Sequence, residues 1–305
     1  MVASPATELT SLLAEVRRIE VFSHRLVMGV MTGAYRSVFR GSGIEFEEVR
    51  EYVEGDDPRS VDWNVTARMG HPFVKTFVDE RERSLLFLLD LSESMNAGFG
   101  HWSSRQMAAH LCACLALAAV KNNDKVGLAG VHREVEAYSA PRKGRGHALR
   151  IIRHCLALPT RPGPTNWKAA LDLAASAIPR HSVVFLVSDF LGEVGGAALA
   201  ACARRNDVVA LRLVLPELVP PPSGLWRLRD PETGREQAVD ASHVPTREAL
   251  AARVAAGRAR TDAAFRRAGV DVVDVPLPRT RDHHAVAQPL VEFFRRRSMR
   301  RRLVL

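Results

Sequence analysis

The stretch from Ser84 to Met95 reads Ser-Leu-Leu-Phe-Leu-Leu-Asp-Leu-Ser-Glu-Ser-Met, and it decides the fold. Its apolar run, residues 85–89, is too short to cross a membrane and is typical of a strand buried on both faces of a parallel sheet. Asp90, Ser92 and Ser94 then follow at alternate positions. At the carboxyl end of a central strand, where open α/β sheets bind ligands, these oxygens can be directed at one point. Such oxygens suit Mg²⁺, so the stretch predicts a buried strand that ends at a cation site.

Two later stretches extend this candidate site. Residues 161–167, Arg-Pro-Gly-Pro-Thr-Asn-Trp, form a turn cluster that opens a helix, and residues 181–188 form another apolar strand that runs into Asp189. Helix capping is the alternative role for Thr165 and Asn166, because both residue types cap helices well. A single Asp-x-Ser-x-Ser is a weak signal, whereas the order and spacing of all three pieces favour one shared site.

The three pieces together resemble the metal-ion-dependent adhesion site of von Willebrand factor A domains. The resemblance implies that two serines and a threonine coordinate Mg²⁺ or Mn²⁺, while the aspartates act mainly through water. One departure is Pro164, where that family usually has a second glycine before the threonine. The predicted metal-site residues are Asp90, Ser92, Ser94, Thr165 and Asp189.

Strands alternate with helices along the rest of the chain. This alternation predicts an α/β fold with a doubly wound, mostly parallel sheet of the von Willebrand A or Rossmann-like kind. Prolines at residues 216–222 interrupt it, and Leu225–Leu228 and Glu236–Val239 flank a turn and read as an inserted hairpin. The expected strands are 85–89, 124–131, 134–139, 181–188, 208–215 and 270–275. One expected helix begins near Ser103, a second follows a basic loop at 142–147, and the others span 167–178, 196–205, 247–268 and 285–296.

The chain divides into three expected regions. Residues 1–82 carry an N-terminal helix and an extended segment, and residues 83–280 form the sheet domain with a hairpin insertion near 216–245. Residues 281–305 form a closing helix and an arginine-rich tail. The four cysteines show no metal-finger spacing and read as buried thiols in a reducing compartment. No targeting segment or long apolar run is visible, so a cytoplasmic location without a transmembrane segment is expected.

A dense mixture of charged and aromatic residues precedes the sheet. Residues 55–63 read Gly-Asp-Asp-Pro-Arg-Ser-Val-Asp-Trp, after Gly-Ile-Glu-Phe at 43–46 and Arg-Glu-Tyr at 50–52. An Ala67-Arg68 pair follows. These stretches closely resemble the signature of the domain-of-unknown-function 58 family. The resemblance implies a von Willebrand A-like domain after the signature, and similarity to proteins commonly encoded beside MoxR-type AAA+ ATPases.

The signature is expected to be structural. Its aspartates can cap turns and pair with Arg59 and Arg68, while Trp63 can lie beneath them as an apolar lid. The expected arrangement is a buried charge cluster that holds the N-terminal segment on the sheet domain, in which loss of one member would cost about 3–5 kcal/mol. An interaction surface is the alternative. The residues assigned to this structural role are Asp56, Asp57, Arg59, Asp62 and Trp63.

The function expected from these features is a non-enzymatic, Mg²⁺-dependent, chaperone-like adaptor. Its partners would be a MoxR-type AAA+ ATPase and a client protein that bears an acidic residue. A Mg²⁺-dependent phosphoester hydrolase with Asp90 as nucleophile is an alternative, although no paired lysine or general acid stands at a phosphatase spacing. Nucleic-acid binding is another, because six of the charges behind the net +9 lie among the arginines of residues 295–302. That tail has no interleaved aromatic residues, which disfavours it as a nucleic-acid site.

Overall fold

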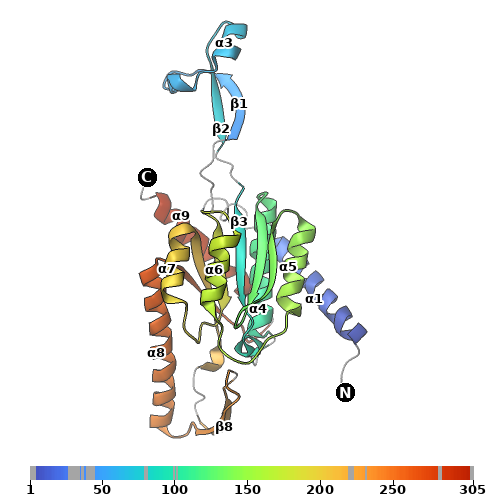
Figure 1. The fold of residues 1–305 in the computed structure, drawn as a ribbon, viewed down its shortest axis with the longest axis vertical. Coiled ribbons are helices and arrows are strands. Elements are labelled where there is room, and N and C mark those ends of the chain that lie inside the picture. Colours follow the sequence, from blue (N-terminus) through green and yellow to red (C-terminus); the bar gives the residue numbers. More distant parts are fainter. Residues whose placement is uncertain are drawn as a thin grey trace.

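The computed structural model describes residues 5–26, 35, 38, 45–78, 82–98, 100, 102–218, 223–230, 232–280 and 284–302 (Figure 1). The strands are β1 (Glu45–Glu51), β2 (Phe73–Val78), β3 (Ser84–Asp90), β4 (Lys125–Val131), β5 (Val135–Arg142), β6 (Val183–Ser188), β7 (Asp207–Val214), β8 (Leu225–Arg229), β9 (Glu236–Asp240) and β10 (Asp271–Pro276). The helices are α1 (Pro5–Leu26), α3 (Trp63–Met69), α4 (Ser104–Lys121), α5 (Arg145–Ala157), α6 (Trp167–Ala177), α7 (Gly196–Arg205), α8 (Val244–Ala268) and α9 (His284–Arg302). Short 3₁₀ helices lie at η2 (Pro58–Ser60), η3 (Glu93–Asn96) and η4 (Pro216–Leu218).

The central sheet has the strand order β10-β7-β6-β3-β4-β5. All neighbouring strands are parallel except β5, which runs antiparallel to β4 along the edge. The chain first moves from β3 to β4 on one side and later returns to place β6 on the other side of β3. The expected doubly wound, mostly parallel sheet is confirmed, and its order reverses between β3 and β6.

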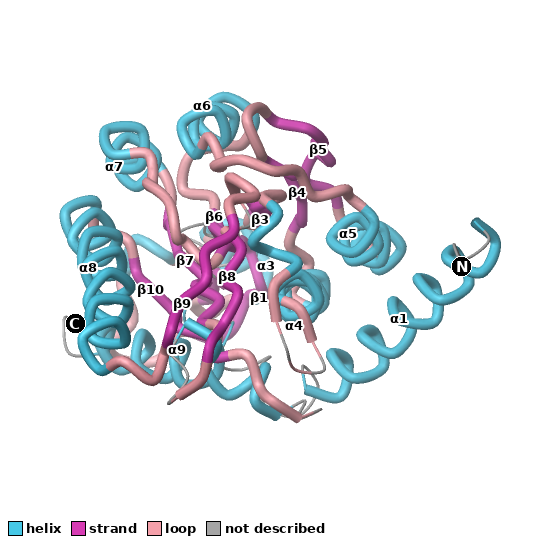
Figure 2. The backbone as a smooth tube through the Cα atoms, turned by 90° about the horizontal axis from the view of Figure 1, so that it is seen from below, coloured by secondary structure: helices cyan, strands magenta, loops and turns pink. Residues whose placement is uncertain are grey.

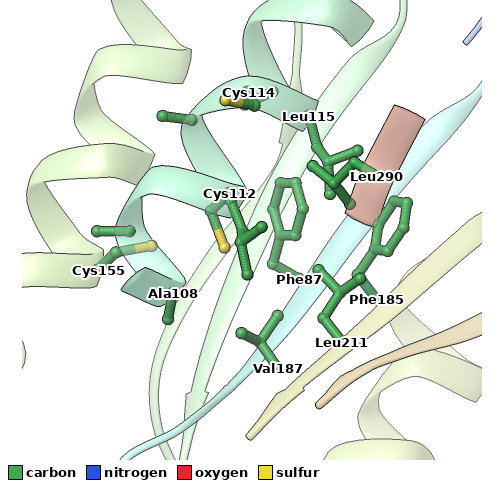
Figure 3. Packing of buried hydrophobic residues seen from close by; sticks show 14 of the residues in the cluster. Phe87, Ala108, Cys112, Cys114, Leu115, Cys155, Phe185, Val187, Leu211 and Leu290 are labelled. Carbon is green, nitrogen blue, oxygen red and sulfur yellow. The ribbon is translucent and has the colours of Figure 1, made fainter. Parts of the chain in front are cut away.

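The sheet separates two hydrophobic cores. The odd-numbered residues of 85–89 on β3 belong to the core shared with α1, α4, α5 and α9, and the even-numbered ones to the core shared with α6, α7 and α8. Figure 3 shows part of the first core, where Phe87 and Phe185 stack with ring centroids 5.6 Å apart, close to Cys112 and Leu211. The chain's four cysteines are buried and free, as expected. Burial on both faces explains why β3 is an unbroken apolar run.

Helix α4 lies deep in the first core and begins where the sequence predicts. Ser103 Oγ accepts a hydrogen bond from Gln106 N at 3.3 Å, and Gln106 Oε1 accepts one from Ser103 N at 3.0 Å. This reciprocal capping box satisfies two backbone donors at the start of the helix. The same helix is covered by α1, so the N-terminal helix packs on the sheet domain, with Ile19 fully buried.

Two additions lie at opposite ends of the sheet. The β1–β2 hairpin and α3 project beyond the amino end of β3, and the β8–β9 hairpin lies beyond the carboxyl end (Figure 1). Figure 2 views the molecule from the side of the β8–β9 hairpin and shows it across the sheet end near β3 and β6. The predicted hairpin insertion is therefore present, and it stands at the end of the sheet where ligands bind in this kind of fold.

The arginine-rich segment is largely helical and partly engaged. Residues 295–302 lie within α9, and Arg297 forms ion pairs with Asp207 and with Asp271, the latter at 3.4 Å. Arg300 also approaches Asp271 at 3.7 Å. The expectation of a tail separate from the closing helix is therefore wrong for its described residues, because carboxylates of β7 and β10 attract the arginines onto the sheet edge. Among the described helices, none has the length and apolar content required for a bilayer span.

Candidate metal centre

The reversal of strand order places two strand-end aspartates side by side. Asp90 ends β3 and Asp189 follows β6, and these strands are paired in parallel with Leu89 opposite Val187. The carboxyl ends of both strands therefore face the same crevice. All five residues predicted for the metal site line one cavity of about 560 Å³ at this end. The structure thus brings them together, while their role as ligands stays a prediction.

Asp90 is held by hydrogen bonds on both carboxylate oxygens. Oδ1 accepts from Ser92 N at 2.8 Å and from the Thr165 hydroxyl, and Oδ2 accepts from the Ser188 hydroxyl at 2.6 Å. The side chain is only 4% exposed. These bonds fix the carboxylate and fill much of its acceptor capacity. Asp90 is therefore arranged to orient its neighbours rather than to point a free oxygen into the cavity.

Ser92 and Ser94 place two hydroxyls at the start of η3. Both residues are 2% exposed, and their Oγ atoms lie 3.0 Å apart. The 3₁₀ turn brings the two side chains onto the same side because the chain leaves β3 and curls immediately after Leu91. Two adjacent hydroxyls provide hard oxygen donors of the kind that Mg²⁺ accepts.

The loop before α6 delivers Thr165 to this cluster. Gly163 adopts φ +110, a conformation that favours glycine, and its carbonyl accepts a hydrogen bond from His132 Nε2 at 3.1 Å. Asn166 caps α6, accepting from Ala169 N at 3.3 Å. The capping alternative thus holds for Asn166 but not for Thr165, whose hydroxyl donates to Asp90. Because Gly163 and His132 fix the loop, Pro164 does not keep Thr165 away from the site.

Asp189 carries the least satisfied carboxylate of the cluster. Its side chain is 6% exposed, Oδ1 accepts from Leu191 N at 3.2 Å, and Oδ2 is buried without a hydrogen-bond partner among the described residues. Burial and the nearby charge of Asp90 raise its pKa to about 6. A buried carboxylate oxygen without a hydrogen-bond partner, close to three hydroxyls, is available to interact with a cation.

The donor set fits a hard divalent cation that keeps some of its water. Among the described residues, no three His, Cys, Asp or Glu side chains are grouped so that they could hold a metal ion by themselves. A cation here would therefore depend on the hydroxyls of Ser92, Ser94 and Thr165. Mg²⁺ commonly takes few direct protein ligands, and oxygen-only donors exclude the softer metals that prefer thiolate.

Two members of the site have little or no signal in the sequence. Ser188 directly precedes Asp189 and donates to Asp90, but a serine at the end of an apolar strand is too common to be noticed. Glu232, in the β8–β9 turn, lines the same cavity from a stretch far along the chain. Burial and the charge of Asp90 raise its pKa to about 7, and the charges of Asp189 and Asp230 add to that rise. No spacing rule connects it to β3.

The outer wall of the cavity is basic. Arg212 of β7 and Arg253, Arg258 and Arg260 of α8 line it. Arg212 is already engaged by Asp262 and Asp274, each at 2.6 Å. Arg258 also pairs with Asp274, whereas Arg253 and Arg260 are exposed on α8, so an elongated acidic group would meet favourable charge on the helix side.

The Gly-Asp-Asp signature forms a separate small module at the other end of the sheet. Arg50 makes a two-pronged contact with Asp56, with both N–O distances 2.7 Å, and this hydrogen bonding lowers the pKa of Asp56. Asp57 caps η2 by accepting from Arg59 N at 2.9 Å. The residues of this module are local turn and cap residues of a projecting hairpin.

Three expectations for the signature are therefore wrong. Trp63 is 72% exposed, so it is not a lid, and Asp56 pairs with Arg50 rather than with Arg59. Asp62 caps α3, accepting from Asn64 N at 3.0 Å, and contacts Lys75 of the same hairpin at 3.2 Å. Because these contacts are closed within residues 45–78, they stabilise the module itself rather than clamp the N-terminal helix to the sheet.

Comparison with known proteins gives one family and several distant similarities. A family model described as "Protein of unknown function DUF58" matches residues 48–260, which include both the signature and the strand-end aspartates. Rv1480, an uncharacterized protein of Mycobacterium tuberculosis, is 28% identical over 274 residues, covering 88% of this chain and 86% of that protein. The solved structure of the conserved hypothetical protein BatB from Bacteroides thetaiotaomicron gives a TM-score of 0.43 at 16% identity, covering 70% of this chain and 99% of that chain. The SpRpn10 VWA domain gives 0.38 at 11% identity, covering 69% and 94%.

Proposed function

Since this chain belongs to the DUF58 family, we propose that it is a non-enzymatic protein-binding adaptor that uses a divalent cation at the carboxyl end of β3 and β6. The observation that carries the proposal is the buried, unpartnered Oδ2 of Asp189 beside the hydroxyls of Ser92, Ser94 and Thr165. Bound there, Mg²⁺ or Mn²⁺ would supply a positive charge with open positions for an external carboxylate.

In this proposal some residues of the site bind the cation and others position the residues that bind it. The three hydroxyls would be direct ligands, because they are neutral oxygens at the floor of the cavity. Asp90 holds the Ser92 backbone and the Thr165 hydroxyl in place through its hydrogen bonds. Asp189 would contribute negative charge close by. A cation held mainly by neutral hydroxyls keeps more of its charge for a partner than one held by several carboxylates.

A hydrolase with Asp90 as nucleophile is disfavoured by the same contacts. A nucleophilic carboxylate needs a free oxygen directed at the substrate. Ser92 N, Thr165 and Ser188 instead occupy both oxygens of Asp90. The hydrogen-bonded, buried state of this carboxylate therefore supports binding rather than covalent catalysis.

The partner we propose is a MoxR-type AAA+ ATPase, together with a client that presents an acidic residue. The support is the resemblance of the signature to proteins encoded beside such ATPases. The basic wall of the cavity adds to it, because Arg253 and Arg260 would favour acidic residues that flank the anchoring carboxylate. Nucleic-acid binding through α9 has weaker support, since Arg297 is already paired with two aspartates.

The test is a pull-down of the ATPase with the wild type, Thr165→Ala and Ser176→Ala. Ser176 is a matched control because its hydroxyl bonds only to carbonyls of its own helix, away from the cavity. We expect Thr165→Ala, and EDTA added to the wild type, to release the ATPase, while Ser176→Ala retains it. Equal binding by all three proteins in EDTA would remove the cation from the account of partner binding.

A further inference from the structure

The β8–β9 hairpin buries one carboxylate oxygen, Oε2 of the half-buried Glu232, and leaves its apolar side chains in water. Among the described residues of 223–240, every residue is exposed except Glu232 and Val239. Leu225 is 77% exposed and Trp226 is 46% exposed. Burying apolar area is the usual reason for a hairpin to dock on a domain. Because this hairpin instead buries an oxygen of Glu232, an electrostatic partner of that oxygen would explain why the hairpin lies here.

The turn fixes where Glu232 lies. Asp230 Oδ1 accepts from Glu232 N at 2.9 Å, and Asp230 Oδ2 accepts from Thr233 Oγ1 at 2.7 Å. The Asp230 carbonyl accepts from Gly234 N at 2.8 Å, and Gly234 adopts φ +69. A side chain that bonds its own turn in this way stiffens the backbone. Glu232 is therefore presented to the cavity by a defined turn.

The surroundings of Glu232 are negative. It lines the same cavity as Asp90, Ser94 and Asp189, and its Oε2 is buried without a hydrogen-bond partner among the described residues. The Oδ2 atom of Asp189, in a side chain that is 94% buried, is in the same condition. Burying an unpaired carboxylate costs several kcal/mol, and a second and third negative charge nearby add to that cost. A divalent cation reached by both unpartnered oxygens would offset it.

We propose that Glu232 is a cation ligand supplied by the chain itself, so that the β8–β9 turn occupies the position at which a partner's carboxylate would bind. This rests on the proposed function, because it requires the cation held by Ser92, Ser94 and Thr165. A ligand from the chain itself would regulate partner binding, because an acidic partner must first displace the β8–β9 turn from the cation. Since the hairpin buries little apolar surface, that displacement exposes few groups that favour burial.

The experiment measures Mn²⁺ binding to the full chain by the electron paramagnetic resonance signal of free Mn²⁺. The variants are Ser92→Ala, Glu232→Gln and Glu236→Gln. Glu236 is the matched control, because it lies on the same hairpin, loses the same charge, and faces solvent at 3.8 Å from Arg227. We expect Glu232→Gln to weaken Mn²⁺ binding by roughly tenfold to hundredfold, as for other groups that tune a metal site, and Glu236→Gln to leave it unchanged.

The outcomes separate the two proposals. If the wild type and Glu232→Gln bind Mn²⁺ equally while Ser92→Ala does not, Glu232 is not a ligand and only this inference fails. If the wild type binds no more Mn²⁺ than Ser92→Ala, the cation site itself is absent and the proposed function fails as well. A second experiment tests whether the turn occupies that coordination position. Acetate is titrated into the Mn²⁺-loaded wild type and Glu232→Gln, and water-proton relaxation reports the water bound to Mn²⁺. Acetate should displace water from Glu232→Gln at a lower concentration than from the wild type, and equal curves would contradict occupation by the turn.

Discussion

Replacing Asp189 by Asn should stabilise the cation-free protein at neutral pH. The carboxylate is 6% exposed, and burial together with the charge of Asp90 raises its pKa to about 6 from 3.8. A difference of one pKa unit corresponds to about 1.4 kcal/mol. The difference between 3.8 and about 6 therefore corresponds to a penalty of about 3 kcal/mol for the ionised side chain in the folded protein. Asn keeps the volume and an oxygen that can accept from Leu191 N, but it removes the charge.

The pH dependence has a defined sign. Because the pKa of Asp189 is higher in the folded than in the unfolded chain, the folded state binds more protons between about pH 4 and pH 6. Stability of the wild type should therefore fall as the pH rises through that window and stay reduced above it. The free energy of unfolding of Asp189→Asn should exceed that of the wild type by about 1–3 kcal/mol at pH 7.5, and this difference should vanish near pH 4.

The assay is urea unfolding in EDTA at pH 4, 5, 6 and 7.5. Asp172→Asn is the control, because that carboxylate lies on the exposed face of α6 beside Lys168. Saturating Mg²⁺ should reverse the order at pH 7.5, since a ligand that binds only the folded state stabilises it by mass action. An Asp189→Asn protein that is less stable than the wild type in EDTA at pH 7.5 would show that the Asp189 carboxylate does not destabilise the cation-free fold.

Three further substitutions test how the site and the signature module are built. Trp63→Ala should change the free energy of unfolding by less than about 0.5 kcal/mol, because the indole is 72% exposed, and a larger loss in urea unfolding would show that it is packed. Phe265→Ala should cost about 3–5 kcal/mol, because this fully buried ring meets Phe190, the residue after Asp189, at 5.1 Å; a loss under 1 kcal/mol would contradict the packing. Arg50→Ala should raise amide exchange within residues 45–78 by removing both bonds to Asp56, while exchange in β3 stays unchanged; equal increases in both regions would show that the module and sheet unfold together.

The fold and the positions of five site residues could be predicted because their signals are local. The interior of a strand buried on both faces must be apolar, as residues 85–89 of β3 and 183–187 of β6 are, and the chain must turn at the sheet end. The order of strand, loop and strand then brings Asp90, Thr165 and Asp189 together by topology alone. The capping box at Ser103 is also local, since both of its hydrogen bonds lie within four residues.

The features that could not be predicted depend on contacts between distant residues or on exposure. Glu232 reaches the site only because the inserted hairpin folds back over the end of β3, and no periodic pattern encodes that path. The mixture of charged and aromatic residues in the signature predicts a buried cluster. Such a mixture equally suits a projecting hairpin, in which Asp56 and Asp62 close local turns and Trp63 stays in water.

The most direct test of the central claim is the anomalous difference map of a crystal of the wild-type protein grown with Mn²⁺ and measured near the manganese absorption edge. We expect a peak in the cavity at the ends of β3 and β6, within direct bonding distance, about 2 Å, of the hydroxyls of Ser92, Ser94 and Thr165. A map without a peak in that cavity at saturating Mn²⁺, or with its peak bound only by surface carboxylates elsewhere, would contradict it.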